Sequence, residues 1–164
     1  MKTIEIKVYK FEELDKQTQE KVIDNYRFIN VEDSFWYEWI KEDFIRLGLE
    51  IQEFDLGRRN YAKIYIENFE DTSNYIIEEF GDSVLIKQTA KNYLKELKEI
   101  VSNFKEDEDI DREFETLDEN YQHEFEADIV SYLRANYEWE ISDEAIIEEI
   151  KANDYDFTTE GKIY

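Results

Sequence analysis

Between residues 110 and 132 an apolar residue recurs every three or four positions, within the most acidic third of the chain. This spacing places the apolar side chains on one side of a helix, and we expect a long helix over about residues 110–137. A disordered acidic segment has no such stripe, so the acids of this region belong to a folded element. The stripe consists of Ile110, Phe114, Leu117, Tyr121, Phe125, Ile129 and Tyr132.

Negative charge is concentrated in the same region. Residues 106–160 carry 21 acidic side chains against three basic ones, in a chain of 164 residues with a net charge of −23. A field of this sign repels nucleic acid and anionic membranes and attracts basic proteins or cations. We therefore expect no direct binding of nucleic acid or membranes. Aromatic residues make up 16% of the chain, which is enough to build a core.

Helical and extended patterns alternate along the rest of the chain. Ile4, Ile6 and Val8 alternate with polar residues and predict a strand. Two further strands flank a turn over residues 55–60, and together they predict an antiparallel hairpin. The expected fold is α+β in a single domain of residues 1–164, with five to six helices packed on a small antiparallel sheet of three to four strands. Helices are expected near 15–29, 33–47, 73–80, 83–104, 110–137 and 142–150, with an extended piece near 155–163.

The composition excludes several classes of function. The chain has no cysteine, so it has no disulfides, thiol catalysis or thiolate metal sites. Nucleophile elbows, phosphate-binding glycine loops and zinc spacings are absent, so we expect no enzyme, cofactor or metal. Neither an apolar signal core nor a membrane-spanning stretch occurs, which favours a cytoplasmic protein.

The acids of residues 106–128 are the candidate binding surface. They number twelve against one base, Arg112, over a helix of about 34 Å. One net charge per about 3 Å is close to the spacing of about 3.4 Å along one strand of duplex DNA. Like charges four residues apart destabilise a helix, so a basic partner would explain their retention. The predicted partner-binding residues are Glu106, Asp107, Glu108, Asp109, Asp111, Glu113, Glu115, Asp118, Glu119, Glu124 and Asp128.

Other interpretations of these acids stay open. The acidic side chains could simply form a solvated face without a partner. Asp107, Asp109 and Asp111 with Asp118 have the spacing of a calcium loop, but Arg112 stands where that loop requires glycine. The only histidine, His123, is expected to face outward among the acids rather than to act in catalysis.

Aromatic residues and basic residues each form one further cluster in the sequence. Residues 35–39, with the sequence Phe-Trp-Tyr-Glu-Trp, form the densest aromatic cluster, which we expect to lie mainly in the core. An exposed aromatic anchor at an interface is the alternative. Arg58 and Arg59 form a basic doublet at the predicted hairpin tip, where ordinary solvation is expected.

The chain resembles a family of acidic proteins encoded by phages and prophages of low-G+C bacteria, over nearly its whole length. The resemblance rests on Tyr9–Leu14, on Leu49–Asn60 ending in Phe-Asp-Leu-Gly-Arg-Arg-Asn, on Thr89-Ala90-Lys91, and on Ser142–Ile146 through Asp154–Lys162. None of these motifs is a chemical signature, and the family provides no catalytic residues. Some relatives carry an antitoxin-like label. The resemblance implies a phage setting and hence the cytoplasm of a host cell.

The charge and the resemblance together predict a phage-encoded accessory protein. Such a protein would bind and inhibit a basic, nucleic-acid-binding host defence protein, for example a CRISPR nuclease or a restriction enzyme. Nucleic-acid mimicry is one mechanism that the charge spacing suggests. The alternative is an antitoxin or regulatory module that neutralises a basic toxin. A carboxylate-based enzyme or metal module and a homo-oligomer that buries its aromatic surface are weaker alternatives. The sequence does not determine the oligomeric state.

Overall fold

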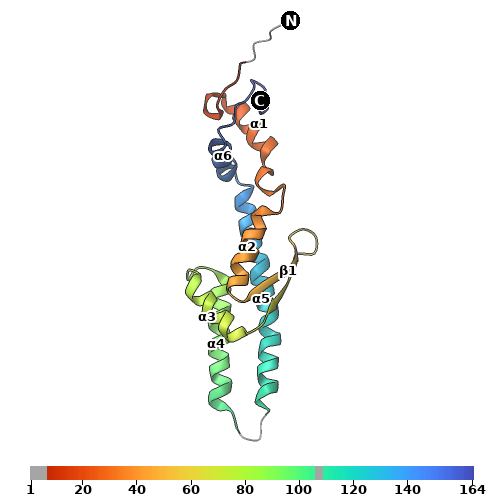
Figure 1. Cartoon of the computed structure of the whole chain (residues 1–164), viewed down its shortest axis with the longest axis vertical. Coiled ribbons are helices and arrows are strands. Elements are labelled where there is room, and N and C mark those ends of the chain that lie inside the picture. The colour runs from red at the N-terminus through yellow and green to blue at the C-terminus, as the bar shows by residue number, and fades with distance from the viewer. Residues whose placement is uncertain (1–6, 106–108) are drawn as a thin grey trace. The chain divides into compact units, whose positions relative to one another are not determined.

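The computed structural model describes residues 7–105 and 109–164 (Figure 1). Its internal contacts form two compact units. The terminal unit consists of residues 1–36 and 135–164, and the central unit of residues 37–134. Whether residues 1–164 fold as the one predicted domain stays a prediction. In the described residues the helices and strands are η1 (Phe11–Glu13), α1 (Lys16–Tyr26), η2 (Ile29–Val31), α2 (Phe35–Arg46), β1 (Leu49–Asp55), β2 (Tyr61–Ile66), α3 (Phe69–Glu79), α4 (Leu85–Asn103), α5 (Ile110–Glu140) and α6 (Asp143–Ala152), where η denotes a 3₁₀ helix.

The predicted α+β class is confirmed, with less sheet than expected. In the described part of the chain the sheet has two antiparallel strands, β1 and β2, so three to four strands were too many. The expected first strand falls largely on residues 1–6, which lie outside the described residues. The closing segment forms only single bridges, from Phe157 to Tyr9 and from Phe157 to Ile163. A turn beginning at Thr158 reverses the chain immediately, which leaves no length for a ladder.

The terminal unit is built around one aromatic residue. Phe157 is fully buried, and its ring lies edge-on to Phe11 and Tyr26, with ring centroids 6.4 and 6.3 Å away. Asp15 and Ser142 cap α1 and α6 as predicted, each accepting a hydrogen bond from a backbone N–H three residues later. The buried core of this unit is Phe11, Leu14, Val22, Ile23, Ile146, Ile150 and Phe157.

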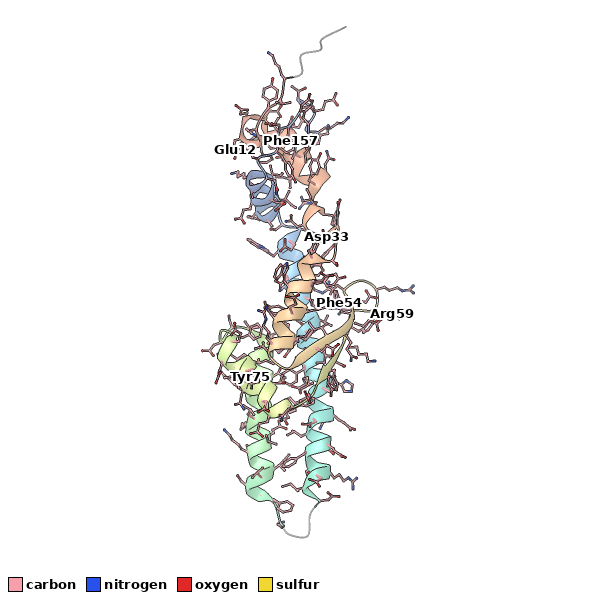
Figure 2. The ribbon with its side chains drawn as sticks, in the orientation of Figure 1. Glu12, Asp33, Phe54, Arg59, Tyr75 and Phe157 are labelled. Atoms are coloured by element: carbon pink, nitrogen blue, oxygen red, sulfur yellow. The ribbon has the colours of Figure 1, made fainter. Side chains whose placement is uncertain are left out.

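The central unit begins with the predicted hairpin. Leu49 of β1 lies opposite Ile66 of β2, and the register shifts between Ile51 and Glu53 at a bulge. Gly48 ends the turn after α2 at φ +83°, where glycine has no steric cost. Arg59 points away from the hairpin tip (Figure 2).

Helices α3 and α4 and residues 110–134 of α5 complete this unit. α5 begins at Ile110 as predicted and ends at residue 140, three residues later than expected. Its stripe is buried from Leu117 to Ile129, whereas Ile110, Phe114 and Tyr132 are only half-buried. α3 begins at Phe69 rather than Ser73, because Asn68 caps it by accepting a hydrogen bond from Asp71 N–H at 3.0 Å.

Candidate partner-binding surface

Six of the predicted acids lie exposed on the first half of α5 and on the residue that precedes it. None of the six forms an ion pair with a lysine or arginine of the described residues. The carboxylate of Asp109 accepts a hydrogen bond from Arg112 N–H at 3.3 Å, at the start of the helix. The arrangement therefore leaves exposed carboxylates on more than one side of the helix available to a basic partner. We call these six the outward acids: Asp109, Asp111, Glu113, Glu115, Glu119 and Glu124.

Two predicted residues face inward instead, toward α4. Tyr93 donates its hydroxyl proton to Asp118 Oδ1 at 2.8 Å, and Thr89 donates to Asp128 Oδ2 at 2.6 Å. Both carboxyls are half-buried. Burial raises the pKa of Asp118 and of Asp128, while the hydroxyl bonds act in the opposite direction. The prediction of an outward face was therefore wrong for these two, which serve the packing of α4 on α5.

The remaining three predicted residues, Glu106, Asp107 and Glu108, lie outside the described residues. The described outward acids run from residue 109 to residue 124, a helical rise of about 22 Å. The six outward acids and the exposed Arg112 together carry a net charge of −5, which is one charge per about 4.5 Å of helical rise. This is sparser than one strand of duplex DNA, at about 3.4 Å per charge. Over residues 109–124 the exposed charges are therefore spaced more widely than phosphates on one strand, and the density predicted for residues 106–128 stays a prediction.

Polar side chains near the middle of α5 anchor the helix to the sheet. Gln122 donates from Nε2 to the carbonyl of Ile64 at 3.0 Å and to Glu126 Oε1 at 3.2 Å. His123 is exposed, as predicted, and its Nδ1 lies 3.2 Å from Glu126 Oε2. The bond from Gln122 to Ile64 links α5 to β2, whereas the contacts of Glu126 lie within the helix.

The proposed calcium loop is not formed by the described residues. Asp111 and Asp118 both lie on the continuous helix α5, and Asp118 is bound by a tyrosine hydroxyl. Residues 7–105 and 109–164 contain no group of three or more His, Asp or Glu side chains arranged to hold a metal ion. Asp107, the first residue of the motif, is outside the described residues.

The aromatic cluster divides between half-buried and exposed positions. Trp36 packs on Tyr137 with ring centroids 5.6 Å apart, and Tyr37 packs on Phe54 at 5.1 Å. Phe35 and Trp39 are 64% and 67% exposed, so the expectation of a core cluster was wrong for these two. Their positions match the alternative of exposed aromatic side chains.

Sequence reasoning missed one basic feature. Lys91, Lys95 and Lys98 lie exposed along α4 at spacings of four and three residues. We call these three the lysine stripe. The helical spacing of these lysines can be read from the sequence. It was overlooked because the net charge of the chain is strongly negative.

Comparison of the chain with protein-family models, with curated proteins and with solved structures finds no significant match. No helix in residues 7–105 and 109–164 is both long and apolar enough to cross a bilayer.

Proposed function

We propose that this protein binds a basic protein through the outward acids of α5 and thereby blocks that partner's nucleic-acid site. The observation that carries the proposal is the group of six exposed carboxylates on α5 and the residue before it, none of which a described lysine or arginine neutralises. Acids of one sign on a rigid helix attract a basic surface and accelerate association with it. A nuclease groove that normally holds phosphates has the complementary charge.

The sequence resemblance to phage and prophage proteins implies that this binding takes place in a phage-infected host cell. There the partner is a host defence protein, such as a CRISPR nuclease or a restriction enzyme. No catalytic group is required of the chain, because occupation of the nucleic-acid site is sufficient for inhibition.

The test is capture of such nucleases on the immobilised chain across a series of salt concentrations. The test variant carries Asp111→Lys, Glu113→Lys, Glu115→Lys and Glu119→Lys. The control variant carries the same number of reversals at exposed acids elsewhere, namely Glu20→Lys, Glu42→Lys, Glu78→Lys and Glu148→Lys.

We expect wild-type binding to weaken with salt, and the α5 variant to bind about 100-fold or more weakly than the control variant. Equal binding by the two variants would refute the assignment of the surface. A basic toxin captured in place of a nuclease would support the antitoxin alternative on the same surface.

A further inference from the structure

The central unit contains a cavity of ≈ 560 Å³ where the start of α3 meets α4 and α5. α4 and α5 continue side by side past α3 (Figure 1). Sites that bind small molecules measure about 300–1,000 Å³, so this cavity has room for a ligand or for side chains of a partner. Its lining determines which chemistry it accepts.

Aromatic and aliphatic side chains form the walls of this cavity. Phe69 of α3 and Tyr93 of α4 lie with their ring centroids 5.7 Å apart, and Phe114 of α5 adds a third ring. Leu97 and Val101 extend the apolar lining along α4, and Val101 is 57% exposed. Aromatic faces attract cations that carry an apolar or planar body.

The charged groups that line the cavity are mostly acidic. Glu67 and Glu70 are exposed, Asp118 is half-buried, and no lysine or arginine of the described residues forms an ion pair with any of the three. Lys98 is the one member of the lysine stripe in this lining. Three carboxylates against one ammonium leave the cavity with net negative charge, which is complementary to a cation.

Asp118 is the least hydrated of these carboxylates. Its Oδ1 accepts the hydrogen bond from the Tyr93 hydroxyl at 2.8 Å, whereas its Oδ2 accepts none from the described residues. Burial raises the pKa of Asp118, because the charged form has lost water without gaining a cation. A positive charge that enters the cavity would therefore stabilise the Asp118 carboxylate.

We propose that this cavity binds an arginine side chain of the basic partner, together with an apolar neighbour of that arginine. A guanidinium stacks on aromatic rings, pairs with carboxylates through two parallel hydrogen bonds and is more weakly hydrated than an ammonium. Leu97 and Val101 offer the surface for the apolar neighbour. Arginine is also the residue with which many proteins bind phosphate, and it is enriched among the side chains that dominate interface energies.

This inference rests on the proposed function, because it names the kind of residue by which the basic partner is held. The two can fail separately, since peptide binding is measured on the chain alone, without a nuclease. Absence of peptide binding would overturn this inference and leave the capture experiment to decide the proposed function. Peptide binding without capture of any nuclease would refute the proposed function and retain the arginine specificity of the cavity.

The first experiment titrates a capped pentapeptide into the isotopically labelled chain and follows amide chemical shifts by NMR. The peptide carries one arginine between two leucines, with a glycine at each end. One matched peptide has citrulline, which keeps the shape of arginine without its charge, and another has lysine. We expect saturable shifts within residues 67–70, 97–102 and 114–118. Both matched peptides should bind about 10-fold more weakly. Equal binding of either one, or shifts spread over all acidic surfaces, would overturn the proposal.

A second experiment removes two carboxylates from the cavity. Glu67→Gln with Glu70→Gln should weaken binding of the arginine peptide about 10-fold. The control, Glu42→Gln with Glu78→Gln, removes the same charge from exposed positions elsewhere in the central unit and should change binding by less than about twofold. Equal weakening in the two double variants would show that only the net charge matters and would contradict the proposed site.

A third experiment changes the positive charge of the cavity. Val101→Lys should abolish peptide binding, because the introduced ammonium competes for the same carboxylates. Leu85→Lys is its control, since Leu85 is 62% exposed at the first position of the same helix and does not line the cavity. Lys98→Gln should strengthen binding more than Lys95→Gln, whose side chain lines other cavities. Unchanged binding in Val101→Lys, or equal effects of the two glutamine substitutions, would refute the assignment.

Discussion

Tyr93→Phe tests whether the inward acids serve the fold. The substitution removes the hydroxyl that donates to Asp118 Oδ1 at 2.8 Å, and it keeps a ring that is only 3% exposed and lies edge-on to Tyr121. A hydrogen bond to a charged acceptor contributes about 1.5–3 kcal/mol, and a half-buried carboxylate has little water to replace it. We expect the free energy of unfolding to fall by about 2 kcal/mol at neutral pH.

Tyr121→Phe is the matched control. Its hydroxyl donates to Glu96 Oε1 at the same distance of 2.8 Å, and its ring is buried to a similar extent. Glu96 is exposed, however, so water replaces the lost bond. We expect a loss of about 0.5–1 kcal/mol, and the difference between the two variants isolates the burial of the acceptor.

Urea unfolding followed by far-UV circular dichroism measures both losses. The Tyr93 hydroxyl bond favours the charged form of Asp118 and so lowers its pKa, against the rise caused by burial. The loss in Tyr93→Phe should therefore be largest above the pKa of Asp118 in the folded protein and should shrink as the pH falls below it. A loss in Tyr121→Phe as large as that in Tyr93→Phe, or a loss independent of pH, would refute this reasoning.

Three other substitutions probe the central unit, each followed by the urea midpoint. Ser73→Ala should stabilise by about 1 kcal/mol, because the buried Ser73 hydroxyl has no partner in the described residues; a destabilised variant would contradict this. Gly48→Ala should destabilise by about 2 kcal/mol or more, since φ is +83° and a Cβ would lie 2.6 Å from Thr72 Oγ1; an unchanged midpoint would show that the turn relaxes. Burial raises the pKa of Asp128. Its charged form therefore opposes folding. The free energy of unfolding should fall as the pH rises from the pKa of this carboxyl in the unfolded chain to its higher pKa in the folded protein. Asp128→Asn keeps an acceptor for Thr89 and should be more stable than wild type at neutral pH but not at acidic pH; an equal advantage at both would exclude titration of Asp128 as the cause.

Elements whose signals are local were predicted well from the sequence. The stripe from Ile110 onward predicts α5 because seven apolar residues share one side of it. Ser142 and Asp15 predict the starts of α6 and α1, since a cap acts within three residues. The start of α3 was missed, because its first turns bury Thr72 and Ser73, which carry no apolar signal.

The candidate surface shows where local reasoning ends. From helical spacing alone, Asp118 and Asp128 were predicted to be exposed like the acids around them. What turns these two inward are the hydroxyls of Tyr93 and Thr89, 25 and 39 residues away in the chain. The partial exposure of Phe114 likewise depends on where α3 and the sheet end, which is a property of the tertiary fold.

The central claim is that the outward acids of α5 compete with nucleic acid for a basic partner. The most direct measurement is displacement of fluorescently labelled nucleic acid from a nuclease captured by the chain, followed by anisotropy. We predict that the wild type and the variant reversed at Glu20, Glu42, Glu78 and Glu148 displace the nucleic acid at similar concentrations. The variant reversed at Asp111, Glu113, Glu115 and Glu119 should leave it bound. Equal displacement by both variants, or a complex that holds the chain and the nucleic acid together, would contradict the claim.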